Sequence, residues 1–244
     1  MGRFLCLLLL FALFVPGALA EQSTLEIKLD DPAAGGLSSG AVRIVVMLTL
    51  LSVAPAILLL MTSFVRLIIA FHFLRQAMGT PQVPPNQVLI GLALFLSFFI
   101  MSPVIDQVNK AAWTPYEDGE LSAMEAVDAA SGPFKDFMLR NTRQEDLKLF
   151  IGMARIERPK TRQDLPMKVV VPSFVISELR AGFEIGFLLF LPFIVVDLVV
   201  ASVLLSMGMM MLPPAMISLP FKIMLFVMVD GWSLVTGSLV AGFH

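Results

Sequence analysis

Residues Gly182 to Pro214 read GFEIGFLLFLPFIVVDLVVASVLLSMGMMMLPP, and this stretch decides the fold class. Its apolar run from Phe183 to Met207 exceeds the roughly 20 residues that a helix needs to cross the hydrocarbon of a bilayer. Asp197 lies near the middle of the run, where a carboxylate is costly unless it faces protein or a cavity. The stretch therefore predicts a membrane-class helix that carries a functional acid and ends in a methionine-rich turn.

The composition of the chain also indicates a membrane protein. Of its 244 residues, 57% are hydrophobic and 15% are charged, and the mean hydropathy is +0.87. These values lie far from those of soluble domains. The net charge of −2 argues against binding to nucleic acid, which requires a clustered basic face.

The N-terminus has the pattern of a secretory signal peptide over residues 1–20. Arg3 precedes an apolar run, and Ala18-Leu19-Ala20 precedes the expected cleavage before Glu21. The alternative is an uncleaved anchor helix, for which the run is short. Cleavage removes Cys6, the only cysteine, and leaves two histidines far apart in sequence. We therefore expect no disulfide, no metal site, no cofactor and no catalytic residue.

Two predicted segments follow the leader. Residues 21–41 are polar, acidic and rich in Gly and Ser, which is typical of a flexible linker. Residues 42–106 contain two apolar runs, Val42–Leu74 and Val88–Ile105, joined by a short Pro-rich turn. They predict a first helical hairpin whose first helix is kinked at Pro55.

Residues 107–181 form a predicted extracytoplasmic insert. Residues 107–180 hold 11 of the 17 basic and 11 of the 19 acidic residues, and the chain has a helix-breaking Gly132-Pro133 pair. We expect two short amphipathic helices, the second starting at a capping box from Thr142 to Glu145. Their apolar stripes include Phe137 and Phe150, which we expect to pack between copies of the chain as well as within one.

Residues 182–244 predict a second hairpin, made by Phe183–Met207 and Leu219–Val240 around the methionine-rich turn. The whole chain is thus predicted to be an all-α membrane-type protein, with two long helical hairpins of four apolar segments and an amphipathic-helical insert between them. The leader places the insert on the outer side of the membrane. Its basic residues do not oppose this topology, because the positive-inside bias acts through short loops.

The apolar runs contain four ionisable residues that we expect to be buried: Arg66, Asp197, Lys222 and Asp230. Counted from a turn centred near Pro213, the two acids lie at equal depth and Lys222 lies about 12 Å nearer the turn at 1.5 Å per residue. Two interpretations stay open, a proton relay or interhelical hydrogen bonds that fix packing.

The residues that lead into the second hairpin predict a contact between subunits. Pro172 favours a helix break there, and Ser173 is suited to cap the helix that follows. Glu178 lies one helical turn before Gly182, and Gly182 and Gly186 form a small-xxx-small pattern that lets helices approach closely. We expect Glu178, Gly182 and Gly186 to lie at an interface in an oligomer.

Several long, ordered blocks of this chain resemble the FliP family of the bacterial flagellar export gate, which is related to the SctR subunit of virulence type III secretion. The blocks are FVISELRAGFEIG from Phe174, PFIVVD from Pro192, SMGMMMLPP from Ser206, LPFK from Leu219 and DGW from Asp230. Ser173 stands where the family pattern has alanine. The first 40 residues and roughly residues 112–161 carry no block that matches.

The resemblance implies a subunit of a protein-conducting gate in the inner membrane and flagellar basal body. It implies about five copies around a pore, FliQ-like and FliR-like partner subunits within a larger export apparatus, and unfolded rod, hook and filament proteins as substrates. It also implies that apolar segments are buried against other subunits. Met209, Met210 and Met211 resemble the pore-constricting methionines of the family, and three consecutive residues cannot share one helical face. The alternative for these methionines is a helix end that fills core space.

Two other classes of function remain as alternatives. A small-solute or proton-coupled transporter would use Asp197 and Asp230, but the chain shows no inverted repeat. A membrane enzyme is weaker still, because no nucleophile and base lie near each other in sequence.

The leader yields a direct prediction. Signal peptidase should cut before Glu21 and leave a mature chain without cysteine. N-terminal sequencing of the assembled protein checks this, and recovery of Met1 would contradict it.

Overall fold

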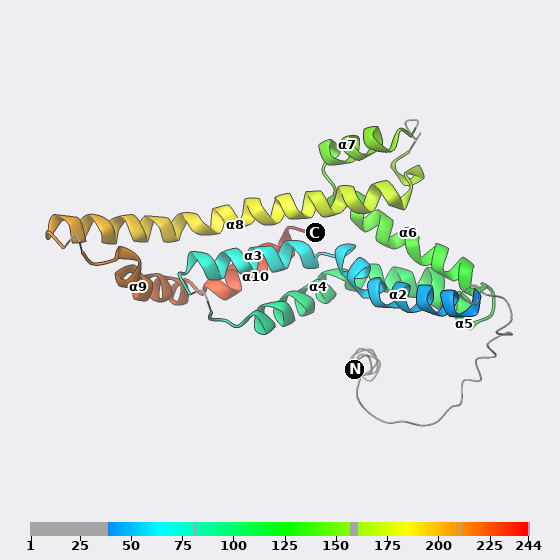
Figure 1. The fold of residues 1–244 in the computed structure, drawn as a ribbon, viewed down its shortest axis with the longest axis horizontal. Coiled ribbons are helices and arrows are strands. Elements are labelled where there is room, and N and C mark those ends of the chain that lie inside the picture. The colour runs from blue at the N-terminus through cyan, green and yellow to red at the C-terminus, as the bar shows by residue number, and fades with distance from the viewer. Residues whose placement is uncertain (1–38, 81, 157–160, 210, 244) are drawn as a thin grey trace, which may run out of the picture. The chain divides into compact units, whose positions relative to one another are not determined.

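The computed structural model describes residues 39–80, 82–156, 161–209 and 211–243 (Figure 1). The predicted signal peptide and nearly all of the predicted linker lie outside these residues. The chain divides into two compact units, residues 1–52 and 53–244. The described part of the first unit is the N-terminal portion of helix α2, Ser39–Leu60, and all the packing below belongs to the second unit.

The first apolar run is broken at a different point from the one predicted. Pro55 lies inside α2, and a new helix, α3, spans Phe64–Ala77. The break falls at residues 61–63, where side-chain hydroxyl groups take the place of some helical backbone hydrogen bonds. Thr62 Oγ1 donates to Leu59 O at 2.8 Å, and Ser97 Oγ donates to Thr62 Oγ1 at 3.2 Å. The helix α2 continues through Pro55, where a kink stays a prediction, and the run breaks after Leu60, where a hydroxyl cluster with the facing helix stabilises the break.

The first hairpin is completed by α4, Asn86–Val108, which packs against α3. A π-helix, η1, spans Asn109–Trp113, and the short α5 spans Thr114–Glu117. Both continue the axis of α4 into the insert, so the helix from Asn86 to Glu117 is 32 residues long.

The insert contains α6, Ala123–Asn141, α7, Gln144–Ala154, and the 3₁₀ turn η2, Arg162–Asp164. The predicted break at Gly132-Pro133 is wrong, since α6 runs through both residues. A proline inside a helix costs about 3 kcal/mol. The buried Phe137, Met138 and Leu139 stabilise the continued helix, at about 1.5–3 kcal/mol for each large apolar side chain.

Helix capping in the insert also differs from prediction. Thr142 does not cap α7; its hydroxyl donates to Met138 O at 2.7 Å. A capping box lies instead at the start of α6, where the Ser122 N–H donates to Glu125 Oε2 at 2.9 Å. This bond holds the pKa of Glu125 below its usual value.

The longest helix is α8, Met167–Ser206, with Pro172 and Pro192 inside it. The predicted break at Pro172 is wrong, and Ser173 is no cap: its hydroxyl donates to Val169 O at 2.6 Å. Both Ser173 and the neighbouring Phe174 are fully buried, which explains why packing keeps this segment helical. Because α8 runs through residues 181 and 182, the predicted domain boundary there falls within one helix.

The second hairpin ends with α9, Pro214–Met228, and α10, Gly231–Ala241. Among the described residues, α4 with its extension and α8 are long and apolar enough to cross a membrane. The number rises to four if the bent pairs α2–α3 and α9–α10 each count as one span. The described residues form helices and no strand, which confirms the predicted all-α membrane-type fold.

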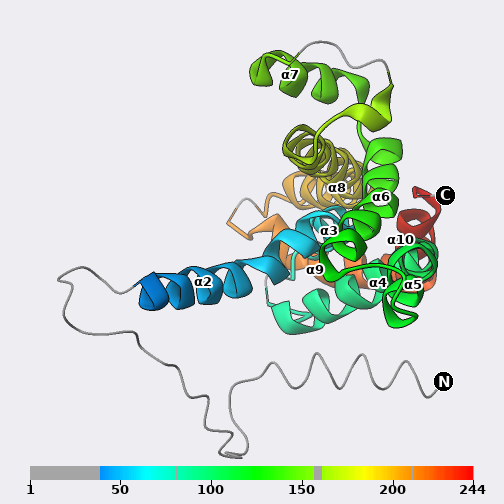
Figure 2. The ribbon, with the colours of Figure 1, turned by 90° about the vertical axis from the view of Figure 1, so that its right-hand side faces the viewer.

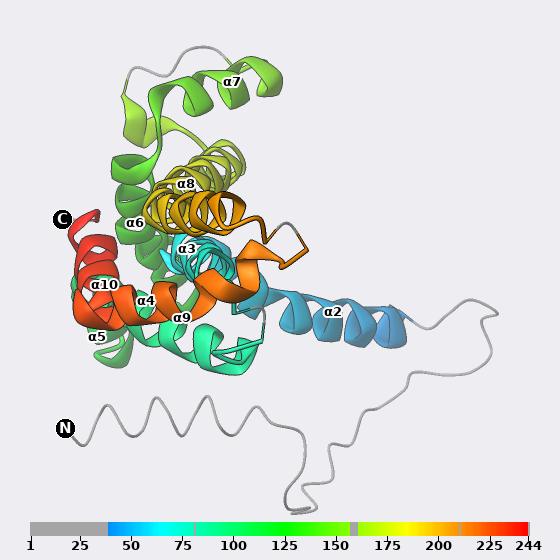
Figure 3. The ribbon, with the colours of Figure 1, turned by 90° about the vertical axis from the view of Figure 1, so that its left-hand side faces the viewer.

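The core of the second unit is the contact between α3 and α8, which lie side by side (Figures 2 and 3) and run in the same direction (Figure 1). A Cβ atom on Gly182 would lie 3.0 Å from the Ile69 side chain, and one on Gly186 would lie 2.4 Å from the Phe73 ring. The predicted close approach of a helix to these glycines therefore occurs within one chain.

This packing predicts that Gly186→Val is destabilising. Overpacking of a filled core costs about 1–3 kcal/mol, and Phe73 Cβ lies too close for its ring simply to rotate away. The matched control is Gly237→Val in α10, where nothing lies within 4 Å of an added Cβ. Thermal unfolding in detergent should separate the two variants, and equal melting temperatures would contradict the packing argument.

Candidate functional site

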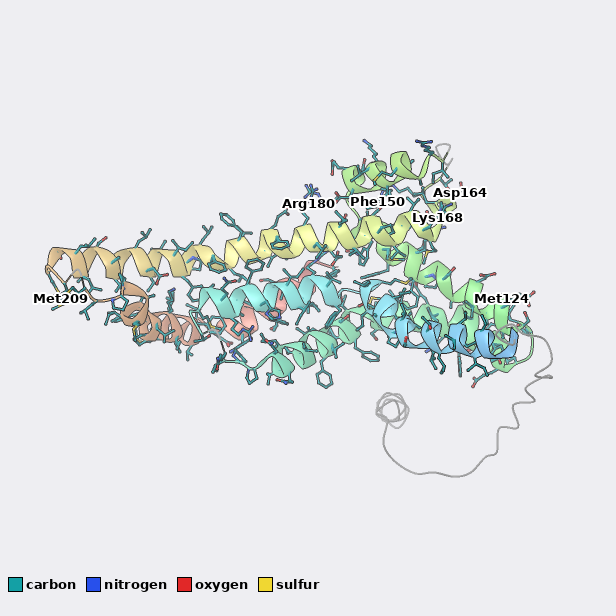
Figure 4. All side chains as sticks on the ribbon, viewed as in Figure 1. Met124, Phe150, Asp164, Lys168, Arg180 and Met209 are labelled. Carbon is teal, nitrogen blue, oxygen red and sulfur yellow. The ribbon has the colours of Figure 1, made fainter. Side chains whose placement is uncertain are left out.

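The methionine-rich turn is the irregular segment between the end of α8 at Ser206 and the start of α9 at Pro214. Gly208 has φ +76°, a backbone conformation that residues other than glycine rarely adopt. The Met209 N–H donates to Leu204 O at 3.0 Å. These features end α8 as a left-handed cap. The turn projects at the tip of the hairpin, where Met209 is labelled in Figure 4.

The described methionine side chains of this turn do not fill the core of their own chain. Met209 is 42% exposed and Met211 is 98% exposed, while Met210 lies outside the described residues. The interpretation of a helix end that fills core space is therefore wrong for Met209 and Met211 within one chain. A pore role for the three stays a prediction.

A partly buried ion pair joins the two helices that carry the turn: Lys222 is buried as predicted, but the Asp197 side chain is 37% exposed in one chain. Lys222 Nζ on α9 lies 2.6 Å from Asp197 Oδ2 on α8, and the Ser218 hydroxyl donates to Asp197 Oδ1 at 2.5 Å. Lys222 also donates to Ala77 O, at the end of α3, at 3.3 Å. One ammonium group thus ties α8, α9 and the C-terminal end of α3 together.

The predicted depths of these charges are wrong, because the turn begins earlier than assumed. Asp197 lies nine residues before the end of α8 (206 − 197), and Lys222 lies eight residues after the start of α9 (222 − 214). The turn is therefore centred near residue 210 and not near Pro213, which brings Lys222 level with Asp197. The two open interpretations were a proton relay and interhelical hydrogen bonds. The bonds of Asp197 to Ser218 and Lys222 fit the second.

Asp230 is arranged differently. It lies between α9 and α10 with φ 50° and ψ 53°, and its side chain does not cap α10. Among the described residues its carboxylate has neither a hydrogen bond nor an ion pair, and its side chain is exposed, so the expectation of burial fails within a single chain.

A second ion pair, which is buried, lies where α3 and α8 meet at the insert. Arg66 Nη2 and Nε donate to the two carboxylate oxygens of Glu178 at 2.5 and 3.0 Å, in the bidentate geometry that is strongest for such pairs. Arg66 Nη1 also donates to Gly242 O at 3.2 Å, and its guanidinium lies 3.7 Å from the centre of the Phe243 ring. The end of α10 therefore covers the pair.

The predicted interface residues are mostly buried inside one chain. Phe137 is 4% exposed and packs its ring on those of Phe174 and Phe243, with centroid distances of 5.9 and 6.2 Å. Glu178 is fully buried with Arg66. Phe150, on α7, is half-buried against the core (Figure 4). Contacts of these residues with another copy stay a prediction.

Sequence reasoning missed one buried acid. Asp146, 2% exposed on α7, accepts from the Ser177 hydroxyl at 2.8 Å and from Arg180 Nη2 at 3.2 Å. These bonds attach α7 to α8, which Figure 1 shows on one flank of the long helix. The available signal was the position of Asp146 beside the apolar stripe of α7. An acid in the first turn of a helix is so common that this position alone does not predict burial. Within the described ranges, no group of three His, Cys, Asp or Glu side chains is placed to hold a metal.

Known proteins that are similar to this chain agree with the resemblance found in its sequence. The family model described as the FliP family matches residues 47–239. The chain is 54% identical over 205 residues to the flagellar biosynthetic protein FliP of Bacillus subtilis, covering 84% of this chain and 93% of that protein. It is 51% identical over 230 residues to FliP of Caulobacter vibrioides, covering 94% and 86%. It is 47% identical over 246 residues to FliP of Aquifex aeolicus, covering all of both chains.

The buried pair yields a stability prediction. Glu178→Ala leaves the Arg66 guanidinium buried without its carboxylate and should cost about 3–5 kcal/mol of unfolding free energy. The matched control is Glu184→Ala, because Glu184 pairs with Arg143 at 2.9 Å in an exposed bridge worth about 0–1 kcal/mol.

The double variant Arg66→Met with Glu178→Leu tests the cause, since it removes both charges and should recover much of the lost stability. Thermal unfolding of the four proteins in detergent is the measurement. A double variant no more stable than Glu178→Ala would show that the loss has another origin.

Proposed function

The chain belongs to the FliP family, and we propose that it lines the central pore of the flagellar protein export gate together with FliQ-like and FliR-like subunits. It is a membrane protein of flagellar biosynthesis and a component of the export apparatus. Its task is to conduct unfolded rod, hook and filament proteins through a passage that is sealed at rest.

The observation that carries this proposal is the methionine-rich turn on a fixed stem. Met211 is almost fully exposed at the tip of a hairpin whose helices are tied by Asp197, Ser218 and Lys222. Methionine is unbranched and polarizable, so a ring of such side chains closes on itself and still deforms around varied polypeptides. Irregular backbone at membrane depth is tolerated where protein or a cavity covers it.

A single turn cannot surround a pore, so the proposal includes several copies of the chain, five by resemblance to the family. Long helix α8 leaves a broad apolar face uncovered in one chain, with Phe183, Phe187 and Leu188 each more than half exposed. Contiguous exposed apolar surface of this kind is typical of protein contacts or lipid contacts. Neighbouring copies would cover it, with Phe150 and the insert contributing on the outer side.

The parallel direction of α3 and α8 supports the proposed topology. The turn after α3 and the methionine-rich turn after α8 both lie at the ends of helices that run the same way. If the leader is exported, both turns lie toward the cytoplasm, and the insert with α6 and α7 lies in the periplasm.

The same geometry weakens the alternative of a proton-coupled transporter. Asp197 is held by an ammonium and a hydroxyl group, and Asp230 has no partner among the described residues, so the two acids form no relay with each other. A gate needs no catalytic residue, and we propose that the chain is not an enzyme.

We propose that the three methionines of the turn form a gasket that seals the resting pore, and this role predicts a leak when they are removed. Replacing Met209, Met210 and Met211 together by alanine removes the bulk that closes the pore, so the complex should assemble normally and conduct ions at rest. Conductance of the purified complex in planar bilayers is the measurement.

The matched control replaces three exposed methionines away from the turn, Met124 and Met153 of the insert and Met224 of α9, by alanine. It makes the same chemical change outside the turn and should stay sealed. An assembled turn variant that is as tight as the control would remove the gasket role.

A further inference from the structure

We propose that Asp230 marks a contact surface for a different membrane subunit, one that carries a lysine or arginine inside an apolar segment. The inference rests on the proposed function in assuming a gate built from several kinds of subunit. Its basis is an exposed carboxylate on an apolar surface, together with cations of α3 and α9 that are already bonded within the described part of the chain.

The backbone holds Asp230 at a fixed break between α9 and α10. Its φ of 50° lies in the left-handed region, which aspartate tolerates better than most residues. A Cβ atom on Gly231 would lie 2.2 Å from the Phe226 ring, and that ring also packs on Trp232 at a centroid distance of 5.4 Å. The position of Asp230 is thus set by aromatic packing on the residues beside it.

The surroundings of Asp230 are apolar. It is the only charged residue between Ile223 and Ala241. Large apolar side chains next to it are well exposed: Val227 69%, Met228 76%, Val229 49% and Leu234 58%. An ionisable group on such a surface is expensive in lipid and normally pairs with another group.

The described cations of the neighbouring helices α3 and α9 are already engaged, and the other lysines and arginines of the second unit lie in the insert, within residues 107–180. Lys222 precedes Asp230 by eight residues (230 − 222), about 12 Å of helix, and holds Asp197 and Ala77 O. Arg66 holds Glu178 and Gly242 O at the other end of α10. The two basic residues are only 6% and 8% exposed, so they are as inaccessible to a second copy as to their own Asp230.

Arg75, the other arginine of α3, is also committed. It donates to Asn86 Oδ1 at 2.6 Å and to Pro84 O at 3.2 Å, beside the turn that joins α3 to α4. A second copy of this chain therefore offers no free cation from α3 or α9, and charge complementarity favours a different subunit. Such a pair fixes partner and register, because a mismatched subunit leaves the carboxylate unpaired.

Copurification from detergent-solubilised membranes tests the inference in the assembled complex. Asp230→Asn keeps the shape and removes the charge, and it should reduce the amount of the other membrane subunits retained per copy of this chain by about tenfold. Asp230→Glu keeps the charge and should retain them. Ser233→Ala, on the exposed start of α10, is the control for local disturbance.

A charge reversal identifies the partner. Motile revertants of Asp230→Lys should carry Asp or Glu in place of a lysine or arginine in an apolar segment of another membrane subunit. Retention by Asp230→Asn at the level of the unaltered chain, or revertants confined to this chain, would overturn the inference.

The outcomes separate this inference from the gasket proposal. Lost subunits in Asp230→Asn, with a sealed methionine variant, would leave the contact surface standing and remove the gasket. A leaking methionine variant, with full retention in Asp230→Asn, would do the reverse. If the Asp230→Asn variant fails to accumulate, subunit retention is compared between Asp230→Gln and Asp230→Glu, which again differ in charge and share a similar shape.

Discussion

The contact between α3 and α8 is the constraint on which the second unit depends. Gly182 and Gly186 let Ile69 and Phe73 lie against the backbone of α8, while Arg66 and Glu178 form a bidentate pair at one end of the same interface. A buried ion pair adds little net stability compared with apolar residues in its place, but leaving one of its charges unpaired is costly. The pair therefore specifies the register of α3 along α8. Glycines supply the close approach, and the ion pair fixes where along α8 that approach occurs.

Fixing α3 against α8 determines what the other elements meet. The carbonyl of Ala77, at the end of α3, lies where Lys222 of α9 reaches it while bonding Asp197 of α8. At the opposite end, α10 brings Gly242 and Phe243 over Arg66. The methionine-rich turn is consequently carried by two helices that are each tied to α3, and Met211 in this turn is left almost fully exposed.

Local sequence rules failed where packing outweighed them. Proline predicted breaks at Gly132-Pro133 and at Pro172, yet α6 and α8 run through both because large side chains near each proline are buried, after Pro133 in α6 and on both sides of Pro172 in α8. The observed breaks lie at the hydroxyl-rich residues 61–63 and at Asp230, where side chains or ring packing compensate for lost helical bonds. A proline costs about 3 kcal/mol locally, which two buried aromatic or aliphatic residues offset.

The sequence by itself determined the all-α membrane class, the two hairpins, the insert, the exposed methionine turn and the family, because long apolar runs and ordered motifs are properties of the chain alone. Only the tertiary structure decided the partners of the charges. Asp197 with Lys222, Arg66 with Glu178 and the solitary Asp230 depend on where each helix starts and stops. A shift of three residues in the centre of one turn changes the depth of every charge on it, and such shifts are set by long-range packing that no local pattern encodes.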